Sequence, residues 1–164
     1  MFIAAYFMVT AKHSIQEVLD AAAIQAGSKI NNPDIKEYEG DNLSWRLQAT
    51  SAQEQSNIVV LIEPKIDLYT EKREVIPIQS LTGEYNRKKE WMHFEGQVQA
   101  KYQGWTLNSE QLDYDKTREE IKINVAFVMF QKGMVITGKD MRIFKQSGRV
   151  QVLQGVKMKI EEKP

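Results

Sequence analysis

The chain has 164 residues, 42% of them hydrophobic and 27% charged, which is the balance of an ordinary globular domain with a real core. Lysine plus arginine equals aspartate plus glutamate, at 22 each, so no net charge draws the whole molecule to nucleic acid. The absence of cysteine excludes disulfides, thiolate metal sites and a cysteine nucleophile.

The chain opens with an apolar run, residues 1–11, about half as long as the roughly 20 residues of a membrane-spanning helix. Three interpretations are open. The run is the end of a membrane anchor that starts further upstream, a signal peptide with Val9-Thr10-Ala11 as its cleavage motif, or a short helix packed on the domain.

A short amphipathic helix is predicted over residues 14–26. Ser14 and Glu17 have the spacing of a capping box, and Gly27 would end the helix. Between them, apolar residues recur at helical spacing: Ile15, Val18, Leu19, Ala22 and Ala23. The breaker cluster Asn31-Asn32-Pro33-Asp34 follows. We therefore divide the chain into an N-terminal segment, residues 1–30, and one folded domain, residues 31–164.

From Ile35 onward, short runs alternate between apolar and polar residues, which is the pattern of half-buried strands. One such row holds Met92, Phe94 and Val98, with Gly96 among them. Because glycine leaves a gap in the side-chain row, we expect a bulge or a close backbone approach there.

Turn signals separate these runs. Gln103-Gly104 and Lys132-Gly133 are hairpin signals, and Pro77 marks its segment as an edge or bulged strand because proline cannot donate to a ladder. Roughly ten to fifteen short strands at such spacing predict an all-β protein, as an antiparallel sandwich, jelly roll or barrel.

Candidate reactive groups are few. His93 alternates with Trp91 and Glu95, so we expect it on the face opposite the apolar row, as a surface histidine. Asp113 and Asp115 are two apart and are expected on a turn and a solvent-facing strand face rather than in a cleft. We therefore predict no catalytic residue, no metal site and no cofactor.

Three basic residues are adjacent in one predicted turn. The turn Arg87-Lys88-Lys89 would suit a lipid phosphate, although a solvated turn is the simpler interpretation. Aromatic and basic residues are interleaved, as in single-strand nucleic-acid platforms, but no basic stripe accompanies them. We expect no nucleic-acid partner.

The apolar side of each strand must face another surface. In a closed sandwich it faces the opposite sheet. In an open one it faces a groove, and a groove lined by Trp, Phe, Leu, Ile and Met suits an acyl chain.

Several strand segments together resemble the LptC family. The opening resemblance lies in residues 43–49, LSWRLQA, and 64–69, PKIDLY. Residues 94–98, FEGQV, are similar to the family's Leu-x-Gly-Asn-Val, with Gln97 in place of the usual Asn. Residues 107–115, LNSEQLDYD, resemble Leu-x-Thr-x-x-Leu-x-Tyr, and residues 136–141 and 152–156 are similar to the closing segments. The resemblance covers about residues 35–160 and rests on the order and spacing of these segments.

The resemblance implies a twisted, open, V-shaped β-jelly roll on the periplasmic side of the inner membrane of a Gram-negative bacterium, held by an N-terminal anchor. It implies a transfer module that receives lipopolysaccharide from the LptB–LptF–LptG transporter and hands it to an LptA-like bridge protein. By that analogy the strand over residues 150–160 would meet the bridge, and the end at residues 43–50 would face the transporter.

The same resemblance, with the alternation, gives two sets of candidate site residues. Residues expected to line a lipid trough are Trp45, Leu47, Ile66, Leu68, Ile78, Phe94, Val98, Leu107, Leu112, Ile123, Val125, Ile136, Ile143 and Val152. Residues expected to bind the bridge protein are Val150, Val152, Gly155, Val156, Met158 and Ile160.

Two alternatives stay open. One is a soluble periplasmic bridge protein of the LptA type, which the short N-terminal run would fit. The other is a carbohydrate-active β-sandwich enzyme, which would need two carboxylates facing one groove. No such pair is evident in the sequence.

Overall fold

A computed structural model describes residues 28–160, and the helix expected over residues 14–26 and the apolar run before it lie outside them. All of the regular structure within residues 28–160 is β-sheet, and no helix there is long and apolar enough to cross a membrane. The strands are β1 (Lys29–Asn31), β2 (Asp34–Glu39), β3 (Asn42–Gln48), β4 (Ser51–Gln55), β5 (Ile58–Ile62), β6 (Lys65–Tyr69), β7 (Val75–Gln79), β8 (Thr82–Asn86), β9 (Trp91–Tyr102), β10 (Trp105–Asp115), β11 (Glu120–Gln131), β12 (Met134–Phe144) and β13 (Arg149–Ile160).

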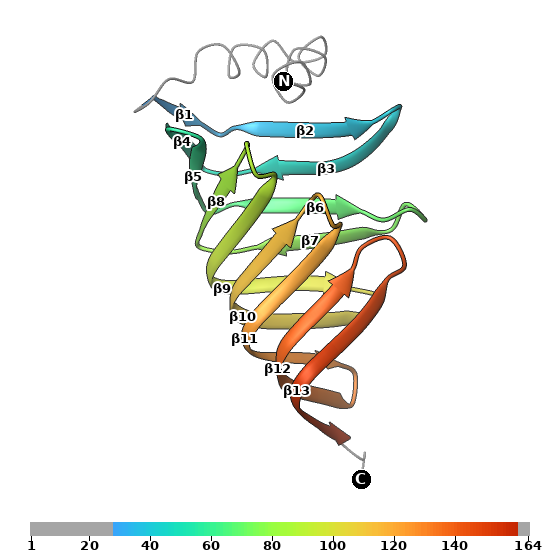
Figure 1. Ribbon diagram of the computed structural model, residues 1–164. Coiled ribbons are helices and arrows are strands. Elements are labelled where there is room, and N and C mark those ends of the chain that lie inside the picture. The colour runs from blue at the N-terminus through green and yellow to red at the C-terminus, as the bar shows by residue number, and fades with distance from the viewer. Residues whose placement is uncertain (1–27, 161–164) are drawn as a thin grey trace.

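The strands form two layers, and the long strands β9 to β13 run through both of them. The first layer runs β1-β4-β5-β8, the second runs β2-β3-β6-β7, and every pairing is antiparallel. The first half of β9 pairs with β8, and its second half pairs with β7. Strands β9 to β13 therefore belong to both layers, which cross at an angle in Figure 1. This is the twisted, open jelly roll that the resemblance implied.

Each long strand bends where it passes from one layer to the other. In β9 the bend lies at Gly96 and Gln97, with φ of 84° and 47°, and the pairing with β10 shifts register there. The bulge expected at Gly96 is confirmed. Positive φ recurs at the corresponding bends of β12, at Asp140, and of β13, at Gly155. These bends form the closed spine of a V.

The hairpin turns lie on the opposite side of the V, which we call the mouth (Figure 1). The predicted turns at Gln103-Gly104 and Lys132-Gly133 connect β9 to β10 and β11 to β12 in the second layer. The turns after β8, β10 and β12 face them from the first layer. The mouth therefore runs the length of the molecule between two rows of turns.

The sheet has two ends. At one end β2 is the outermost strand of the second layer, and β3, which contains residues 43–48, lies beside it, between β2 and β6. At the other end β13 is the outermost strand of both layers. Pro77 pairs in register with Asp67, and the pairing of β7 with β9 is confined to Ile78 and Gln79.

Candidate functional site

One cross-strand row follows the inner face of the second layer from the middle of the sheet to its end. Neighbouring strands place in register, in order, Ile78, Ala100, Leu107, Met129, Ile136 and Met158. The first three are buried, Met129 and Ile136 are partly buried, and Met158 is 58% exposed. The interior of the V therefore opens continuously toward β13.

The predicted trough residues fall into two groups according to how deeply they are buried. Three of them, Val125, Ile136 and Val152, are partly buried and pack against the core from the open end. The remaining eleven are fully buried in one apolar cluster between the layers: Trp45, Leu47, Ile66, Leu68, Ile78, Phe94, Val98, Leu107, Leu112, Ile123 and Ile143. The structure thus places all fourteen in or against one apolar cluster, and eleven of them are buried in it.

Some inner-face residues near the open end were not in the predicted set, among them Phe127 and Met129. Phe127 is buried and Met129 partly buried, and both belong to the dense apolar run at residues 126–130. In that run Val128 and Phe130 are also apolar but point outward, at 40% and 39% exposed. Because both faces carry apolar side chains there, alternation could not tell the inner face from the outer.

The edge strand β13 exposes five large apolar side chains. They are Val150, Leu153, Val156, Met158 and Ile160, and their exposure rises from 40% at Val150 to 64% at Ile160. One side of β13 pairs with β12, and within residues 28–160 no strand pairs with its other side. Of the residues predicted for partner binding, only Val152 is partly buried.

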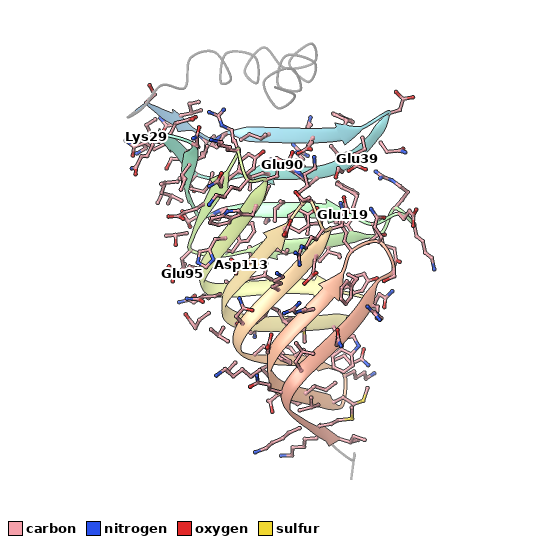
Figure 2. The ribbon with its side chains drawn as sticks, in the orientation of Figure 1. Lys29, Glu39, Glu90, Glu95, Asp113 and Glu119 are labelled. Carbon is pink, nitrogen blue, oxygen red and sulfur yellow. The ribbon has the colours of Figure 1, made fainter. Side chains whose placement is uncertain are left out.

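Polar contacts join the two layers across the first half of the mouth. Lys116, in the turn after β10, forms an ion pair with Glu37 of β2 and lies 3.8 Å from Glu90. The pKa of Lys116 lies below its ordinary value, and burial is the largest cause. The carboxylate of Glu119 opposes this shift, and the charge of Lys145 adds to it. Figure 2 shows Glu90 and Glu119 beside the hairpin turns that face β2 and β3.

A buried lysine makes the second set of contacts. Lys145, in the turn after β12, is 2% exposed. Its Nζ donates to the carbonyl and hydroxyl oxygens of Ser44 on β3, at 3.4 and 3.3 Å, and lies 3.4 Å from a carboxylate oxygen of Glu119. It also donates to the Tyr114 hydroxyl at 3.4 Å. The ammonium is thus surrounded by oxygen atoms of both layers, as a buried charge requires.

Further along the mouth, the turns themselves touch. A side chain on Gly148, in the turn after β12, would overlap the hydroxyl of Tyr102 at the end of β9. Gly148 has φ of 72°, and Gln103 donates to the Tyr102 hydroxyl at 3.1 Å. The two layers are therefore in contact across the mouth from β2 as far as β9.

The groups considered for chemistry lie outside the V. His93 is partly exposed, with Nδ1 2.5 Å from Oδ1 of Asp113 on the neighbouring strand. Arg87 forms an ion pair with Glu54, so this turn is tied to β4. Within residues 28–160 no group of His, Asp or Glu residues could hold a metal ion. The inner face of the V consists mainly of apolar side chains, which suits binding rather than reaction.

Comparisons with known proteins agree with the jelly-roll fold. The family described as lipopolysaccharide-assembly, LptC-related, matches residues 1–161. The curated proteins gave no match. Among solved structures the chain is similar to LptH from Pseudomonas aeruginosa, described as the LptA homologous periplasmic component of the conserved lipopolysaccharide transport device.

The likeness to LptH has a TM-score of 0.55 at 13% identity, and it covers 72% of this chain and 95% of that one. At this identity it shows the fold, an LptA-like jelly roll. The family match extends over nearly the whole sequence. This chain therefore belongs to the LptC-related family of lipopolysaccharide-assembly proteins.

Proposed function

We propose that the chain is a transfer module. It accepts lipopolysaccharide from an inner-membrane ABC transporter of the LptB–LptF–LptG type at the β1 and β2 end. It then hands the lipid to an LptA-like bridge protein at β13, while an N-terminal anchor holds the chain on the periplasmic side of the inner membrane. The apolar row that leaves the core between Ile136 and Met158 is the observation that carries this proposal.

The physical case rests on the acyl chains. Exposing them to water costs about 0.8 kcal/mol for each CH₂ group, so each transfer step must keep them against an apolar surface. In our proposal the fourteen trough residues supply that surface, and the polar head stays in water at the mouth. Met129, Ile136 and Val152, partly buried at the open end, support this proposal, in which they meet the acyl chains as these pass to the next carrier.

The exposed edge supports the handover. A free edge strand offers unpaired N–H and C=O groups to a strand of another protein, which gives affinity through the backbone. If a jelly roll of the same kind adds to β13, its inner face continues the row beyond Met158. The partner-binding residues proposed here are Val150, Val152, Gly155, Val156, Met158 and Ile160.

A transfer assay tests this function. The full chain is loaded with lipopolysaccharide that carries a photo-reactive acyl chain and is mixed with the LptA-like protein of the same organism. The double variant Val156→Lys/Ile160→Lys should still take up lipid but should fail to pass it on, because two charges interrupt strand addition. The control Ile62→Lys/Val75→Lys changes two exposed apolar residues on other strands, at 41% and 42% against 55% for Val156 and 64% for Ile160. Transfer by the β13 variant at the wild-type rate would contradict the proposed docking edge.

A second candidate is a soluble bridge protein of the LptA type. The likeness to LptH favours it, as do the outer edges of β2 and β13, with which no strand of residues 28–160 pairs. Membrane fractionation separates the two candidates. A chain that stays with washed inner membranes is a tethered acceptor, and one that is released is a bridge.

A further inference from the structure

The cross-layer contacts at the mouth bear on how lipid reaches the inside of the V. This inference rests on the function proposed above. The eleven buried trough residues fill the space between the layers, so an acyl chain cannot lie there while the layers stay together. Lipid that enters near β2 must therefore part the layers first.

The spine cannot provide that opening. Strands β9 to β13 run unbroken through the bends, so both layers are held there by covalent chain and by ladder hydrogen bonds. At the mouth, the contacts that join the layers within residues 28–160 are those of side chains and turns. The mouth is the side on which the V can widen.

The contacts there form one group. Glu37 and Ser44 lie on the first hairpin of the second layer, β2–β3. Lys116 and Lys145 lie in two turns of the first layer and hold Glu37 and Ser44, respectively. We call these four residues the latch. Each lysine also has a carboxylate neighbour, Glu90 at 3.8 Å from Lys116 and Glu119 at 3.4 Å from Lys145.

We propose that the latch is an access gate for the acyl chains, which enter the first half of the V only after Lys116 releases Glu37 and Lys145 releases Ser44. Polar contacts suit such a gate because each group regains water when it opens. The opening therefore costs less than separating apolar surfaces alone. The entering acyl chains then cover the inner face that the opening exposes.

A covalent substitute for the latch tests the proposal. The chain has no cysteine, so the double variant Glu37→Cys/Lys116→Cys carries the only two thiols. Without reagent, this variant lacks the ion pair between residues 37 and 116. A bifunctional thiol reagent about as long as the two original side chains joins the two cysteines, and the latch then cannot open.

A matched control carries the same reagent within one layer. Glu84 and Asp113 flank His93 in register on β8 and β10, so the double variant Glu84→Cys/Asp113→Cys is bridged across β9. Two strand spacings are about 10 Å, within reach of the same reagent. That bridge does not cross the mouth.

The measurement is the rate at which lipopolysaccharide loads into each protein, followed by a photo-reactive residue at Phe94. The expected results are loading at least as fast as wild type for the free latch variant and about tenfold slower for the bridged one. The bridged control should load like wild type. Equal loading with and without the latch bridge would overturn the gate and leave the proposed function intact. If wild type itself takes up no lipid at all, the proposed function fails and the gate fails with it.

Discussion

Ile136 of β12 and Met158 of β13 lie directly opposite each other, and the apolar inner row leaves the core between them. Ile136 still packs against the buried cluster, whereas Met158 is 58% exposed. Buried apolar side chains stabilise a domain, and an exposed one on a free edge contributes little. The same row thus serves stability at one end and, in our proposal, binding at the other.

This gradient predicts very different costs for truncating two apolar side chains. Phe94→Ala should lower the free energy of unfolding by about 3–5 kcal/mol, because the ring is fully buried and its removal leaves a cavity. Met158→Ala should change it by less than about 0.5 kcal/mol. Urea denaturation of both variants measures the difference. A large cost at Met158 would mean that the edge is packed in solution, for example by a second copy of the chain.

A tight contact near the open end gives a second prediction. A Cβ on Gly138 would lie 2.9 Å from Cζ of Phe127 and 3.0 Å from Cγ1 of Val152, closer than side chains pack. We therefore expect Gly138→Ala to destabilise the domain by about 1–3 kcal/mol through overpacking.

A variant of Phe127 tests whether overpacking causes the loss of stability in Gly138→Ala. Phe127→Leu removes the ring atoms nearest Gly138, so the double variant should be more stable than the sum of the two single effects by about 1 kcal/mol. Additive losses would show that the cost of the alanine has another origin. Thermal and urea unfolding measure both.

The ion pair between Asp34 and Arg46 predicts a pH dependence of stability. Arg46 donates to both carboxylate oxygens of Asp34, at 2.9 and 2.6 Å. This hydrogen bonding lowers the pKa of Asp34, against a smaller opposing effect of burial. Because the folded-state pKa lies below the ordinary value of 3.8, the stabilisation is complete above that value and is lost as the pH falls through the folded-state pKa.

Asp34→Asn should therefore lower stability at pH 7 by at most about 1 kcal/mol, since both side chains are about one-third exposed. At acid pH, below the folded-state pKa, wild type and variant should converge. Unfolding free energies across the pH range test this. A difference that persisted at low pH would show that the pair acts through packing and not through its charge.

The strands and their inner faces could be predicted from alternation, and Phe94 and Leu112 lie inward as expected because side chains on a strand have period two. Alternation does not show whether the opposite layer covers a residue. For that reason Phe94 and Ile136 were indistinguishable in the sequence, although one is sealed and the other is near the opening.

The latch could not be predicted from the sequence. Lys145 meets Ser44 across 101 positions, and Lys116 meets Glu37 across 79. Nothing in the sequence around Lys145 marks it as buried, or around Lys116 as half-buried. Only the crossing of the two layers brings these turns against β2 and β3.

The most direct test of lipid transport in the V uses photo-crosslinking in a Gram-negative cell, with the reactive residue placed at Met158 or at the adjacent Lys157. Met158 lies in register with Ile136 of the inner row, and Lys157 lies in register with Thr137 on the opposite face. Our account predicts lipopolysaccharide adducts at 158 and not at 157. Equal labelling at the two positions, or none at 158 in a folded and exported protein, would contradict it.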